Sequence, residues 1–367
     1  MKSTRTIDGD TSLVLDSLRL GAALVVLLWH AKDMWFPEKI FPADQPGDPS
    51  HTAVVVFFVL SGFVIAFTTD TRQPTLPEYM QARLARLCSM CVPALLLTAV
   101  AEFAVRANAD PELMAAYVRG AFGPRYLITG AFMNEAWTMS AAPPSNAALW
   151  SLSFEFWYYV IFGLWFCTGR GWKSWLLATG ACLVAGPKIV LMMPVWLMGC
   201  AAYWLPRPQT SRRWAWIGVL LALLAAVWAI EVIRPWPFYI GAAPFYFANQ
   251  FATDWAAAIF VAAGLWLVPP SQLRSALALP SALVGRVRAA ADLTFPIYVL
   301  HFPLLVLWRA LVGTRIGNSA QYALAVSVVL LISCALGVLL ERQRSRWSQL
   351  FRWLGKRSAR LGRPTSL

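Results

Sequence analysis

The chain has 367 residues, of which 59% are hydrophobic and only 13% are charged, and its formal net charge is +13. A soluble protein of this length could carry such a composition only with almost no polar surface, so the repeated apolar runs predict an all-α polytopic membrane protein. The basic residues lie in short loops and in the C-terminal tail, which argues against a nucleic-acid partner as the reason for the charge.

We expect about ten transmembrane helices and divide the chain into a membrane domain, 1–345, and a basic cytoplasmic tail, 346–367. The predicted spans are 13–35, 52–70, 87–105, 149–168, 174–187, 189–205, 214–232, 250–268, 293–312 and 320–340. An even number of crossings places both termini on one side. The loops on that side hold most of the arginine, which predicts cytoplasmic termini in a multi-pass plasma membrane protein of the bacterial inner-membrane type. The tail is interpreted as disordered or as attracted to membrane lipids.

Two stretches do not fit simple spans. Residues 121–137 are apolar but contain Pro124, Arg125 and Glu135, which favours an outer-side re-entrant or interfacial helix. Residues 233–249 are rich in proline and aromatic residues and predict a lid, an acceptor groove or an interfacial collar. The six cysteines lack a secreted-scaffold spacing, and the C-x-x-C of Cys88 and Cys91 lies on a membrane helix with no ligand partners nearby in the sequence. We therefore interpret them as packing thiols and expect no metal.

The first span contains two residues that are costly in lipid, Arg19 and His30. They are eleven positions apart, so on a helix they share one face and lie about 16 Å apart along the axis. Ionisable groups at that depth face a protein interior or a water-filled cavity. His30, with Asp33 one turn further on, is a candidate general base.

Arg83 and Arg86 lie three positions apart at the cytoplasmic entrance of the third span, and therefore share a helix face. Ordinary positive-inside anchoring explains them equally well. With Arg19 at the same depth they would form a trio of guanidiniums, which bind phosphates in a bidentate manner. A phosphorylated cytosolic cofactor is therefore a candidate ligand.

Other polar residues occur inside the apolar runs. Glu155 requires a partner, which His30, an arginine or a substrate hydroxyl would supply. Ser61 and Gly62 interrupt a run of Val and Phe, and close helix packing is the favoured explanation for them. The acceptor-side candidates are His51, Ser61, Trp150, Ser153, Tyr298 and His301.

Taken together, these segments resemble the acyltransferase-3 family of integral membrane acyltransferases. The matching pieces, in the family's order, are LDSLRLGAALVVLLWH, VVVFFVLSGFVIA, RLAR, WSLSFEFWYYV, FPIYVLHFPLL and the closing Glu341–Arg342. The family's usual proline after Glu341–Arg342 is Gln343 here, and we expect the membrane unit to act without the hydrolase-like domain that some members fuse to it.

The resemblance implies transfer of an acyl group, usually acetyl, from acyl-CoA to a hydroxyl of a glycan or lipid-linked sugar at the outer side. It implies that Arg19 and His30 are the family's Arg-x10-His pair and that Arg83 and Arg86 contribute to the acetyl-CoA site. His51 resembles the branch that acts on polysaccharides and related sugars. The catalytic candidates are thus His30 and Glu155, with either direct transfer or an acyl-histidine intermediate.

Three alternatives remain open at the level of sequence. The protein could export small molecules or polysaccharide precursors, although no internal repeat is evident. It could be a lipid-binding scaffold in which the arginines are anchors. It could transfer succinyl or longer acyl groups to a non-glycan acceptor. Neither the acceptor nor the oligomeric state is fixed by the sequence.

Overall fold

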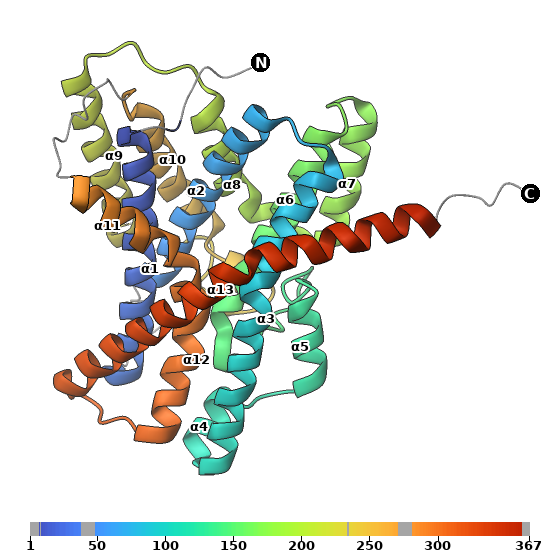
Figure 1. The fold of residues 1–367 in the computed structure, drawn as a ribbon. Helices are drawn as coiled ribbons and strands as arrows, with labels where there is room; N and C mark the ends of the chain where they lie inside the picture. Colours follow the sequence, from blue (N-terminus) through green and yellow to red (C-terminus); the bar gives the residue numbers. More distant parts are fainter. Residues whose placement is uncertain (1–6, 8, 38–47, 233–234, 271–280, 362–367) are drawn as a thin grey trace, which may run out of the picture.

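The computed structural model describes residues 7, 9–37, 48–232, 235–270 and 281–361, and within these ranges it contains helices and no strand. The helices are α1 (Gly9–Trp35), α2 (Pro49–Arg72), α3 (Leu76–Asn108), α4 (Pro111–Tyr117), α5 (Phe122–Gly130), η2 (Pro144–Leu149), α6 (Trp150–Cys167), α7 (Trp172–Ala185), α8 (Pro187–Trp204), α9 (Arg212–Val232), η3 (Tyr246–Ala248), α10 (Phe251–Leu267), α11 (Ser281–Asp292), α12 (Thr294–Val312) and α13 (Ser319–Leu361). They form one bundle, which α13 crosses obliquely (Figure 1).

Each of the ten predicted spans coincides with a helix. Eight helical segments among the described residues are long and apolar enough to cross a membrane. The helices at the other two predicted spans are shorter than these eight: α10 has 17 residues and α7 has 14. The protein is therefore an all-α polytopic membrane protein, as the composition predicts.

The segment before α6 differs in detail from its prediction. The helix expected over 121–137 ends at Gly130, and an irregular loop follows it to Pro143. The predicted collar at 233–249 is irregular apart from η3, and its first two residues lie outside the described part of the chain. The basic tail is helical through Leu361 as a continuation of α13, and no break marks the boundary expected at 345. This observation excludes the disordered alternative for residues 346–361.

Local capping fixes where the functional helices begin. Asp48 precedes α2, and its Oδ1 accepts hydrogen bonds from the backbone N–H groups of Ser50, at 2.8 Å, and His51, at 3.4 Å. The α3 helix starts with a bond from the Thr75 N–H to Glu78. These caps set the first turn of α2 and place the arginines of α3 two turns into that helix.

The helices α2 and α8 cross with their backbones in direct contact. A Cβ atom on Gly62 would lie 2.0 Å from the carbonyl oxygen of Trp196, and one on Gly199 would lie 2.0 Å from that of Val59. The thiol of Cys200 donates to the Gly62 carbonyl across the same crossing. The packing explanation for Gly62 is thus confirmed, since only a residue without a side chain fits there.

We expect Gly199→Ala to destabilise the protein by about 3 kcal/mol or more, because the added methyl group would force the two helices apart. The midpoint of thermal unfolding in detergent, followed by fluorescence-detected gel filtration, measures this loss. The matched control is Gly180→Ala in α7, where an added Cβ meets nothing within 4 Å. Equal stability of Gly199→Ala and Gly180→Ala would contradict the observed crossing.

Candidate functional site

A cavity of about 780 Å³, counting the space at its open mouth, lies between α1, α2, α3, α6 and α12. Arg19, Arg83 and Arg86 line it together, from α1 and α3. Arg83 donates to Thr68 near the end of α2, at 3.3 Å, whereas Phe57 lines the cavity three turns closer to the start of that helix. The arginines therefore occupy one end of the cavity, which we call the arginine end.

The arginine end carries an excess of positive charge. Arg19 is paired only loosely with Asp16, at 3.6 Å, and its guanidinium also interacts with that of Arg86. Arg344, from the part of α13 beyond the predicted span, lies close enough to Arg83 and Arg86 for their charges to interact. The Nε of Arg83 is buried and has no hydrogen-bond partner among the described residues. Converging guanidiniums with a free donor suit a ligand that carries several negative charges.

Glu155 lies in the same cavity, on α6. Its Oε1 accepts a hydrogen bond from Ser61 of α2, at 3.1 Å, and another from Tyr159 one turn further along α6. Ser61 in turn accepts a bond from the indole N–H of Trp196, at 3.2 Å. Ser61 is therefore a polar residue of the cavity wall, while its neighbour Gly62 serves the helix crossing. Of the partners considered for Glu155 from the sequence, the arginines share its cavity.

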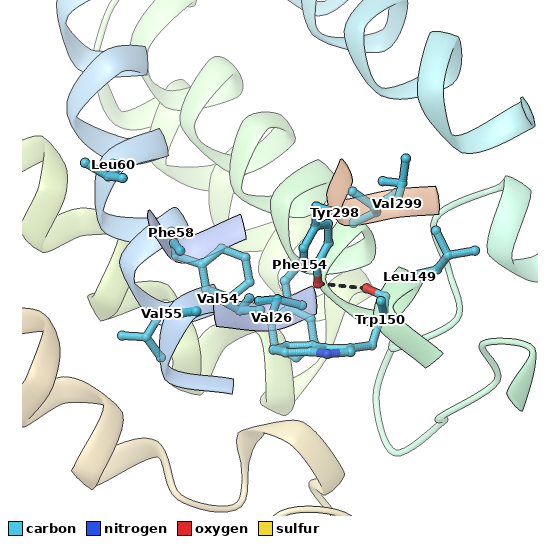
Figure 2. Close-up of a cluster of buried hydrophobic side chains, with 14 of the residues drawn as sticks. Val26, Val54, Val55, Phe58, Leu60, Leu149, Trp150, Phe154, Tyr298 and Val299 are labelled. Atoms are coloured by element: carbon cyan, nitrogen blue, oxygen red, sulfur yellow. Dashed lines mark hydrogen bonds between the residues drawn. The ribbon is translucent and has the colours of Figure 1, made fainter. Parts of the chain in front are cut away.

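The opposite end of the cavity is lined by Val54, Phe57, Ser151 and Tyr298. The Tyr298 hydroxyl bonds with Ser151 Oγ, at 2.8 Å, and its ring packs against Phe57. Tyr298, Phe58 and Trp150 belong to one buried apolar cluster with Val26 and Val54 (Figure 2). His30 does not line the cavity. It lies one turn beyond Val26 along α1, so Phe57, Tyr298 and this cluster separate it from the arginine end.

The chain has three histidines, and two of them bond to each other. His30 Nδ1 lies 2.9 Å from His301 Nε2, with the two rings stacked at an interplanar angle of 5°. His30 Nε2 lies 3.4 Å from the hydroxyl of Ser50. Since the neighbours of His30 come from α2 and α12, which also face Arg19, the two residues of α1 face the same side, as their spacing predicts.

Hydrogen bonds to fixed acceptors determine which nitrogen of His30 is free. His301 Nδ1 lies 2.6 Å from the carbonyl of Tyr298, which can only accept, so Nδ1 carries the hydrogen. In the neutral imidazole, His301 Nε2 then accepts from His30 Nδ1. The remaining nitrogen, His30 Nε2, holds a lone pair next to Ser50, whose hydroxyl donates to Asp48 at 2.7 Å. This arrangement leaves His30 Nε2 able to accept a proton.

The third histidine, His51, is buried one residue beyond Ser50. Its Nε2 lies 2.9 Å from Asp254 Oδ2 on α10, and its ring stacks on Trp150. The two buried groups come from distant parts of the sequence. Reasoning from the sequence missed Asp254, although a carboxylate within the predicted span 250–268 was a signal for it. It also missed Asp48 and Ser50, although Asp followed by Pro is a typical start of a helix.

Ser153 faces away from the cavity, toward the loop that follows α5. Its hydroxyl donates to the Phe132 carbonyl at 2.7 Å. The same loop holds Glu135, which forms a fully buried ion pair with Lys188 at the start of α8. Ser140 Oγ also donates to Glu135, at 3.1 Å. These contacts attach the loop to the bundle beside the first turns of α6.

The structure thus assembles the predicted site residues into three groups. The first is the cavity, with Arg19, Arg83, Arg86, Glu155, Ser61 and Tyr298. The second is the pair of His30 and His301. The third is His51 with Trp150. Among the described residues, no group of three or more His, Cys, Asp or Glu side chains is arranged to hold a metal ion.

The family match and the similar curated protein both indicate an acyltransferase. The acyltransferase-3 family, described as an acyltransferase domain, matches residues 13–338. The chain is 25% identical to "Acyltransferase MdmB" of Streptomyces mycarofaciens over 346 residues, which covers 85% of this chain and 83% of the relative. No solved structure matches the chain.

We expect Lys188→Met to destabilise the protein by about 3–5 kcal/mol, because it leaves the Glu135 carboxylate buried without its cation. Thermal unfolding in detergent measures the change. The double variant Glu135→Gln with Lys188→Met removes both charges and should recover at least half of the lost stability. A single variant as stable as the original protein would contradict a stabilising role for this ion pair.

Proposed function

This chain belongs to the acyltransferase-3 family of integral membrane proteins, and from that premise we propose that it is an O-acyltransferase. It moves an acyl group, acetyl in the first instance, from acyl-CoA to a hydroxyl of a glycan or of another sugar-containing acceptor. The observation that carries the proposal is the cavity into which Arg19 of α1 converges with Arg83 and Arg86 of α3. The helix α1 also carries His30.

The charge of the cavity supports acyl-CoA as the donor. The phosphates of CoA supply the negative charges that the arginine end lacks, and the free Nε of Arg83 donates to them. Because acyl-CoA is cytosolic, this end faces the cytoplasm, and both termini lie on that side of a bacterial inner membrane.

The spacing along α1 supports His30 as the base. His30 lies eleven positions after Arg19 on this helix, about 16 Å along its axis, which is comparable with the reach of a pantetheine arm. The acceptor hydroxyl then gives its proton to His30 Nε2 while its oxygen attacks the thioester carbonyl. The C–S bond breaks, and the leaving thiolate takes the proton from His30. The products are the O-acyl acceptor and the free thiol of CoA, and His30 is neutral again.

Release of CoA thiol tests the function directly. The protein in nanodiscs is given acetyl-CoA with a panel of p-nitrophenyl glycosides, and succinyl-CoA in parallel. We expect thiol release that depends on an acceptor, together with an acylated glycoside detected by mass spectrometry. Uptake of a glycoside into proteoliposomes without thiol release would instead support a transporter and overturn the proposal.

Arg83→Ala and Arg86→Ala should each weaken CoA binding about 10- to 100-fold, because each removes hydrogen bonds to a charged group. Isothermal titration with CoA measures this change, and pantetheine, which lacks the nucleotide, should bind all variants alike. The matched control is Arg106→Ala, an exposed arginine at the far end of the same helix. Unchanged CoA affinity in both cavity variants would contradict the placement of the phosphates.

His30→Ala should reduce turnover about 10²- to 10⁴-fold while leaving CoA affinity and thermal stability close to those of the original protein. Lost turnover with unchanged CoA affinity would show that the variant lacks the base and still binds acyl-CoA. Retained turnover in His30→Ala would refute the assignment of the base.

A further inference from the structure

His51 and Asp254 form a second polar centre that the transfer mechanism above does not use. Both side chains are only 2% exposed, and they approach to 2.9 Å between Nε2 and Oδ2. They belong to α2 and α10, 203 residues apart in the sequence. Such a pair, buried inside a membrane bundle, is costly unless its charges balance.

The carboxylate of Asp254 is surrounded by hydrogen-bond donors and lies at a helix N-terminus. Gln250 donates an N–H to Oδ1 at 2.9 Å, and His51 donates to Oδ2. Asp254 also lies in the first turn of α10, where the helix dipole stabilises a negative charge. An ionised carboxylate next to a neutral imidazole would leave one buried negative charge, so electroneutrality favours the imidazolium form of His51.

The surroundings of His51 favour the same assignment. Its ring stacks on Trp150, with centroids 5.4 Å apart and an interplanar angle of 10°. Trp150 in turn stacks on Phe247 at 4.5 Å. An indole face stabilises a cation lying over it. The other titratable groups around the pair are Asp48, which caps α2, and Tyr158 of α6, which lies near Asp254. Neither adds a positive charge.

Among the described residues, the buried Nδ1 of His51 has no hydrogen-bond partner. A charged N–H without an acceptor costs about 1–3 kcal/mol or more, so a ligand oxygen at this position would be bound strongly. The neighbouring residue, Ser50, contacts Nε2 of His30. The first turn of α2 thus carries the N–H donor, His51, and its residue Ser50 contacts the proton acceptor, His30.

We propose that His51 donates its Nδ1–H to the oxyanion that forms when the acceptor hydroxyl attacks the thioester, and that Asp254 is the positioning residue that keeps His51 charged and oriented. This inference rests on the proposed function. In the step itself the carbonyl π-bond electrons move onto oxygen as the new C–O bond forms. His30 receives the hydroxyl proton, and His51 holds the oxyanion until the carbonyl re-forms. The C–S electrons then leave on sulfur, and the thiolate takes the proton from His30. One such donor is worth about 10²–10³ in turnover.

Nuclear magnetic resonance tests the charge of His51 independently of activity. With three histidines in the chain, [¹⁵N]histidine labelling gives few ring signals, and the His51→Gln variant assigns those of His51. In nanodiscs at pH 7.5 we expect His51 to have both ring nitrogens protonated and His30 to be neutral. In Asp254→Asn the His51 ring should become neutral at the same pH. A neutral His51 in the unmodified protein would overturn the proposal, even if the proposed function holds.

The pH profile of turnover with acetyl-CoA and the best glycoside of the panel tests the role of the pair. His51 must be protonated to donate its Nδ1–H, so Asp254→Asn should move the alkaline limb of the pH profile to lower pH by at least one unit. The KM for acetyl-CoA should change less than threefold. His51→Gln keeps an N–H donor without charge and should retain more turnover than His51→Ala. The proposal would be overturned if the alkaline limb did not shift in Asp254→Asn, or if His51→Gln and His51→Ala lost turnover equally. Either result would show that the pair has only a structural role.

If no glycoside is acylated, the slow hydrolysis of acetyl-CoA by water provides the same readout, since it passes through an equivalent oxyanion. A complete lack of thiol release in the presence of intact CoA binding would count against the proposed function. The resonance experiment would still decide the charge of His51.

Discussion

The hydrogen bond between His30 and His301 is the interaction on which the proposed chemistry depends. His301 is fully buried and donates to a backbone carbonyl of its own helix, so its orientation is fixed by α12. That bond fixes the tautomer of His301, and through it the tautomer of His30. The free nitrogen of His30 is therefore determined by the backbone of a helix 271 residues away in the sequence.

The arginine end of the site could be predicted from the sequence more completely than the histidine groups could. The arginine end could be predicted from the sequence, because arginine at the same depth in neighbouring spans converges once the topology is assigned. Glu155 could be predicted as a site candidate because a carboxylate in an apolar run requires a partner. The partners themselves, Ser61 and Tyr159, could not be chosen, since helical periodicity gives the face of a residue but not the helix that it meets.

The partners of His30 and His51 could not be predicted from the sequence. The sequence suggested Asp33 as the residue that orients His30, on the basis of its position one turn away. The structure places His301 against His30, and Asp254 against His51, both across the bundle. Long-range pairs of this kind depend on which helices pack together and at what height, and a single sequence carries no direct record of either. The presence of each span was easier to predict, because hydropathy alone locates the apolar run. Its ends were less certain, since α3 begins at Leu76 and not at 87, and α13 continues to Leu361 and not to 340.

The contact between α2 and α8 has a consequence for how a substrate enters. With Gly62 and Gly199 seated against opposing carbonyl groups, these two helices cannot slide or separate without losing their packing. The cavity wall supplied by α2 is therefore stationary. The remaining walls come from α1, α3, α6 and α12. A molecule that enters the cavity therefore meets a backbone of fixed position on the α2 side, and Ser61 and Phe57 are carried on that fixed backbone.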